Sequence, residues 1–126
     1  MTTLFTTVAL TALAALCIFQ LALILGAPLG KFAWGGANRV LPIKFRVASS
    51  VSIALYIIFS LFLVSKAGWL DVISDSRILD ISMWVFSIYF LIGIAMNAVS
   101  RSKPERYLMT PVAAILAVSF LIVTLS

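Results

Sequence analysis

Polar side chains are rare in the apolar stretches of this chain, and they are the residues with which it could do chemistry. A polar group inside a bilayer is costly unless it is paired, so it tends to face the interior of a helix bundle. At helical spacing Ser52 and Tyr56 share one face, and Tyr89 and Asn97 share another. Together with Gln20 these residues predict a cavity that faces the cytoplasm and binds a neutral or zwitterionic solute.

The same residues also have a purely structural interpretation. Hydrogen bonds between transmembrane helices contribute about 0.6 kcal/mol each on average, so these groups could simply hold helices together. Small residues such as Ala15, Ala22 and Gly93 would let the helices approach closely. The sequence leaves both interpretations open.

Basic residues in two loops form a second candidate site. Each Lys or Arg near an anionic lipid surface contributes about 1 kcal/mol of attraction. Phe32 and Trp34 in the first of these loops are suited to the headgroup region. The alternative is that the charges only anchor the loops on one side of the membrane. The candidate contacts to anionic lipid are Lys31, Arg39, Lys44, Arg101, Lys103 and Arg106.

Missing residue types exclude several kinds of chemistry. The chain has no histidine, and its single cysteine, Cys17, sits in an apolar run. The sequence therefore offers no disulfide, zinc site, haem ligand or His-based acid–base pair. No Asp or Glu lies in the apolar runs, which argues against a proton-coupled cation exporter. We expect no enzyme activity, no catalytic residue, no metal and no cofactor.

Four apolar runs must position the polar residues. The chain has 126 residues, of which 63% are hydrophobic and 10% charged, whereas soluble domains carry about 25% charged residues. A bilayer core takes about 20 helical residues per crossing. We predict an all-α fold, a four-transmembrane-helix antiparallel bundle that forms a single integral membrane domain over residues 1–126. The predicted spans are about 4–27, 47–65, 81–100 and 107–126. In the last span, Thr110-Pro111 predicts an N-cap followed by a proline at the first helical position.

The distribution of Lys and Arg predicts the orientation. Seven of the nine basic residues lie in the first and third loops, and positively charged loops are retained in the cytoplasm. Both termini are therefore predicted to lie on the outer side. Glu105 is the only acidic residue on the predicted inner side, and we expect it to neutralise a neighbouring arginine. Because topology explains the basic charge, nucleic acid is not an expected partner.

Three segments of the chain resemble a group of uncharacterised small four-helix integral membrane proteins of bacteria. The resemblance implies a location in the bacterial cytoplasmic membrane, the cell inner membrane. No activity is known for that group, so it supplies no site residues. The segments are Gly26-Ala27-Pro28-Leu29-Gly30, Gly35-Gly36 to Leu41-Pro42, and Ser100 to Arg106 with Met109-Thr110-Pro111.

Two functions fit this sequence. The first is a small polytopic membrane protein that acts through helix packing, as a partner or accessory subunit. The alternative is a carrier or channel for a small neutral or zwitterionic solute that uses the polar stripe. The expected partners are the lipid bilayer, anionic lipid headgroups on the cytoplasmic side, and either a second copy of the chain or another membrane protein.

Overall fold

The computed structural model describes residues 1–126 and contains helices, turns and loops but no strand. Four long helices are each long and apolar enough to cross a membrane, which confirms the all-α class. Of 93 backbone hydrogen bonds, 73 lie within helices, as a bilayer requires of a spanning backbone. The elements are α1 (Thr2–Ile24), η1 (Gly30–Phe32), η2 (Trp34–Gly36), α2 (Ile43–Lys66), α3 (Ser76–Ala98) and α4 (Lys103–Leu125).

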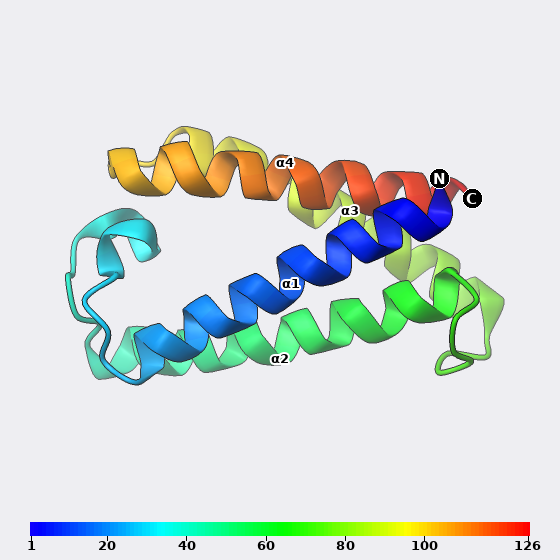
Figure 1. Ribbon diagram of the computed structural model, residues 1–126, viewed down its shortest axis with the longest axis horizontal. Helices are drawn as coiled ribbons and strands as arrows, with labels where there is room; N and C mark the ends of the chain where they lie inside the picture. The colour runs from blue at the N-terminus through cyan, green and yellow to red at the C-terminus, as the bar shows by residue number, and fades with distance from the viewer.

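Each helix runs back along the length of the one before it (Figure 1). Both termini lie at the same end of the molecule as the α2–α3 loop, and we call this the terminal end. There the Thr2 hydroxyl donates a hydrogen bond to the Ser126 hydroxyl at 2.7 Å. The α1–α2 loop and the α3–α4 turn lie at the opposite end. Because the two segments with seven of the nine basic residues meet there, we call it the basic end.

Helix α4 begins earlier than its apolar run suggests. Ser102, not Thr110, is the N-cap, and its hydroxyl accepts a hydrogen bond from the Glu105 backbone N–H at 3.4 Å. The prediction of an N-cap at Thr110 is therefore wrong, and Pro111 lies inside the helix. The reason is a competing start signal, a serine followed three residues later by a glutamate, with Pro104 in the first turn.

Aromatic rings form the centre of the core. Phe59 of α2 lies 4.7 Å from the ring of Phe86 and 5.3 Å from that of Phe90, measured between centroids. Phe120 of α4 completes the cluster at 4.9 Å from Phe90. These rings join the α1–α2 hairpin to the α3–α4 hairpin across their middle. We call this aromatic cluster of Phe59, Phe86, Phe90 and Phe120 the waist. Between the waist and the terminal end, Leu13, Leu63 and similar aliphatic side chains are fully buried.

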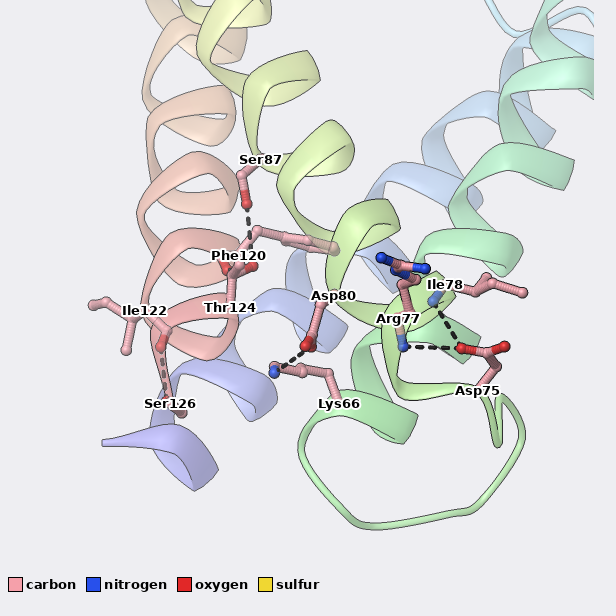
Figure 2. A network of polar contacts seen from close by, with 10 residues as sticks. All are labelled: Lys66, Asp75, Arg77, Ile78, Asp80, Ser87, Phe120, Ile122, Thr124 and Ser126. Atoms are coloured by element: carbon pink, nitrogen blue, oxygen red, sulfur yellow. Dashed lines mark hydrogen bonds and ion pairs between the residues drawn. The ribbon is translucent and has the colours of Figure 1, made fainter.

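Polar contacts tie the helices together near the terminal end (Figure 2). The Ser87 hydroxyl of α3 donates to the Met83 carbonyl at 2.8 Å, and the Thr124 hydroxyl of α4 donates to the Phe120 carbonyl at 2.6 Å. The two hydroxyls lie 3.3 Å apart across the α3–α4 interface. Lys66 of α2 forms an ion pair with Asp80 of α3 at 2.7 Å. The Asp75 carboxylate caps α3 by accepting the backbone N–H groups of its first turn.

Toward the basic end the hairpins separate. Helix α1 lies against α4 near the termini and diverges from it toward the other end (Figure 1). Helices α2 and α3 contact each other much less than the two helices of either hairpin do. The η1–η2 segment packs against α4 at this end. The fold is thus tight at the terminal end and encloses space at the basic end.

Candidate functional site

A cavity of about 460 Å³ lies between the helices on the side of the basic end. Small-molecule sites commonly enclose roughly 300–1,000 Å³, so this space has the size of a ligand site. All five residues that the sequence analysis grouped together line it. They are Gln20 from α1, Ser52 and Tyr56 from α2, and Tyr89 and Asn97 from α3. The structure therefore brings the polar stripes to one cavity, and the binding of a solute there stays a prediction.

The polar groups of the wall differ in how they are satisfied. The Ser52 hydroxyl donates to the Ala48 carbonyl at 3.2 Å, and the Asn97 amide donates to the Gly93 carbonyl at 2.8 Å. Each of these bonds stays within one helix. Gln20 is only 7% exposed, and its side-chain oxygen has no hydrogen-bond partner. A buried acceptor without a donor costs about 1–3 kcal/mol.

The α1–α2 loop forms the roof of the cavity at the basic end. Phe32, Ala33 and Trp34 line the space from this loop. The Trp34 indole N–H donates to the Ser49 hydroxyl of α2 at 3.1 Å, and its ring stacks on Phe45 at 5.7 Å. Trp34 has a φ of 51°, a left-handed backbone conformation that non-glycine residues rarely adopt. These contacts therefore hold the roof in a shape that the local sequence does not favour.

Glu105 of α4 anchors the same loop and also lines the cavity. Its carboxylate accepts the Gly35 backbone N–H at 3.1 Å, and the side chain is only 8% exposed. The expectation that Glu105 neutralises an arginine is wrong, because the chain's one ion pair joins Lys66 to Asp80. The cavity thus has a carboxylate that the apolar runs do not indicate.

The position of Glu105 has a signal in the sequence that is separate from the apolar runs. A serine at Ser102 followed by Glu105 three residues later is the spacing of a capping box, which places the glutamate in the first turn of a helix. The Ser102 hydroxyl also donates to the Lys31 carbonyl, so this turn grips the roof loop at a second point. A Cβ on Gly36 would collide with Ser102, which explains the glycine at the point of closest approach.

None of the six predicted lipid contacts lines the cavity. Three of these cations lie over neighbouring aromatic rings. Lys31 is 5.1 Å from the centre of the Phe32 ring, and Lys44 is 4.9 Å from that of Phe45. Arg106 is 5.1 Å from the centre of the Tyr107 ring. Their contact with anionic lipid stays a prediction. The predicted set is Lys31, Arg39, Lys44, Arg101, Lys103 and Arg106.

The α3 wall of the cavity is also an outer surface of the bundle. Tyr89, Ile92 and Met96 line the cavity, yet they are 48%, 58% and 66% exposed. Tyr89 faces α2, because its ring lies 5.4 Å from that of Phe59. The cavity therefore opens sideways past α3, and α2 and α3 make few contacts with each other.

Comparison with known proteins adds no template for this site. No family model matches the chain, and no curated protein or solved structure matches it. Its function is therefore inferred from the geometry of the chain's own residues.

Proposed function

We propose that this protein is a small integral membrane carrier that binds a small neutral or zwitterionic solute in the cavity. The supporting observation is that five polar residues from α1, α2 and α3 converge on one space of about 460 Å³. A pocket with mostly apolar walls and a few convergent polar groups is the usual form of a small-molecule site.

The hydrogen bonds favour this role over helix packing alone. Where the chain uses polar groups to join helices, the contact is direct, as between Lys66 of α2 and Asp80 of α3. In the cavity, Ser52 and Asn97 bond only to their own helices. The contacts that join the two hairpins across the waist are aromatic. An accessory role through helix packing has no comparable support and is the competing outcome of the test below.

We further propose the orientation in which the basic end faces the cytoplasm and both termini lie outside. Support comes from the gathering of seven of the nine basic residues at one end, because such residues are retained on the cytoplasmic side. The proposal includes an antiparallel bundle in the cytoplasmic membrane of a bacterium, with anionic lipid around the basic end. In this orientation a solute reaches the cavity from the cytoplasmic half of the bilayer. No catalytic role is proposed.

Labelling of introduced cysteines tests the cavity. In a Cys17→Ser background, Asn97→Cys places a thiol in the wall, and Ile88→Cys places one on the exposed surface of α3. We expect a membrane-impermeant maleimide to label Asn97→Cys in inside-out vesicles, and to leave Ile88→Cys unlabelled because lipid covers it. Equal protection of both thiols in native membranes would contradict a water-accessible cavity and would favour the accessory role.

A further inference from the structure

The cavity carries a negative charge without a matching positive one. Glu105 is the only Asp or Glu that lines it, and no Lys or Arg lines it. One carboxylate oxygen accepts the Gly35 N–H, and the carboxylate forms no ion pair. Burying a carboxylate without a counter-ion is unfavourable, although the N-terminus of α4 offsets a part of it. A cationic ligand would supply the missing charge.

A second acceptor in the wall also lacks a donor. The side-chain oxygen of Gln20 is buried and unpartnered, and the side chain is more than nine-tenths buried because only 7% of it is exposed. Gln20 lines the same cavity as Glu105 but comes from α1 rather than α4. Two acceptors that lack donors favour a ligand group that carries a positive charge and donates hydrogen bonds through its N–H groups.

The remaining walls suit the rest of such a ligand. Aromatic side chains surround the space and include Phe32, Trp34, Tyr56, Tyr89 and Phe90. Aromatic faces attract cations and also pack against flat apolar groups. Because the cavity opens past α3 toward the surface that a bilayer would cover, an amphipathic molecule could reach it from the membrane.

We infer that the cavity recognises the ammonium group of an amphipathic amine or amino zwitterion, with the Glu105 carboxylate as its counter-ion and with Gln20 turning its buried side-chain oxygen toward the ligand as a second acceptor. The inference rests on the proposed function, since it names the chemical class of solute for the same cavity. It departs from recognition of a fully neutral solute, for which the wall would need no unpaired carboxylate.

The test compares two probes that share a skeleton, 2-phenylethylammonium and the neutral 2-phenylethanol. Full-length protein in phosphatidylcholine nanodiscs is dialysed to equilibrium with each radiolabelled probe, and empty nanodiscs measure partitioning into lipid. We expect the protein to prefer the ammonium probe by at least about tenfold, the size of a desolvated charge interaction.

Glu105→Gln separates charge from structure. Glutamine keeps a carbonyl oxygen that can accept the Gly35 N–H, so the roof loop keeps its anchor. We expect this variant to bind both probes with the affinity that the wild type shows for the alcohol. The matched control is Asp80→Asn, which removes a carboxylate at the terminal end and should leave the preference unchanged. A second variant, Gln20→Leu, should weaken ammonium binding by about threefold or more.

The outcomes distinguish this inference from the proposed function. Binding of neither probe above the empty nanodiscs overturns both. Equal binding of the two probes to wild type overturns the ammonium inference and leaves the cavity function standing. A preference that survives in folded Glu105→Gln also overturns it. If that variant elutes as aggregate, the wild-type ratio and Gln20→Leu decide, and a ratio below about threefold overturns the inference.

Discussion

A single added Cβ atom on Gly36 should break the contact between the roof loop and α4, and Gly35 provides a matched control position. Both have left-handed backbone conformations, with φ of 73° and 79°. Alanine at either position adds about 1–2 kcal/mol of backbone strain. A Cβ on Gly35 would meet nothing within 4 Å, whereas one on Gly36 would collide with Ser102 and lie 3.0 Å from the Lys31 carbonyl oxygen.

Gly36→Ala should therefore undock the loop, and Gly35→Ala should only strain it. The collision displaces the Ser102 hydroxyl from the Lys31 carbonyl, and that hydrogen bond is worth about 1 kcal/mol. With the strained packing we expect Gly36→Ala to lower the free energy of loop opening by about 1–2 kcal/mol more than Gly35→Ala does. This difference corresponds to about 5- to 30-fold faster exchange of the loop amides.

Hydrogen–deuterium exchange of residues 30–36, measured by mass spectrometry on protein in nanodiscs, provides the readout. The backbone N–H of residue 35 is informative because it donates to Glu105 in the docked loop. Peptides from the middle of α1 provide an internal reference that should not change. Equal acceleration in the two variants, or none in either, would refute the docking of the loop on α4.

Three further predictions concern the rest of the molecule. Ser87→Ala should destabilise the bundle by about 0.6–2 kcal/mol, because it removes the buried hydroxyl that contacts Thr124. Thermal unfolding in detergent measures the loss of stability, and an unchanged midpoint would contradict a polar contact between α3 and α4. Lys66→Gln should lower the stability by less than about 1 kcal/mol, and by less still at high salt, because its partner Asp80 is half exposed. Thermal unfolding with and without 1 M NaCl measures this, and a loss of stability that does not depend on salt would refute the ion pair. Replacing Lys31, Arg39 and Lys44 with glutamine should reduce the anionic lipid that copurifies with the protein, as counted by native mass spectrometry. Unchanged lipid retention would indicate that these charges only set the topology.

The parts of this fold that depend on local pattern could be predicted from the sequence. Apolar runs of about 20 residues predict four helices whatever surrounds them. The spacing of Ser52 and Tyr56, like that of Tyr89 and Asn97, places each pair on one face of its helix. That both faces line one cavity depends on the packing of the helices.

The parts that depend on distant contacts could not be predicted in the same way. Gly35 and Glu105 are 70 residues apart in the chain, and no local pattern connects them. The left-handed conformation of Trp34 runs against the preference of its residue type, so only the finished contacts explain it. At the start of α4 two local signals compete, and the N-cap at Ser102 prevails over Thr110-Pro111; the same serine hydroxyl also engages the roof loop by donating to the Lys31 carbonyl.

The meeting of the two chain ends makes the order of the hairpins an experimental variable. Thr2 and Ser126 touch through their hydroxyls, so a short linker could join the ends without moving a helix. New ends could be cut at Gly68, an exposed glycine in the α2–α3 loop with nothing within 4 Å of the position of a Cβ. In such a circular permutant α3 would leave the ribosome first. Arg101 and Lys103 would then direct insertion before the charges of the roof loop were made.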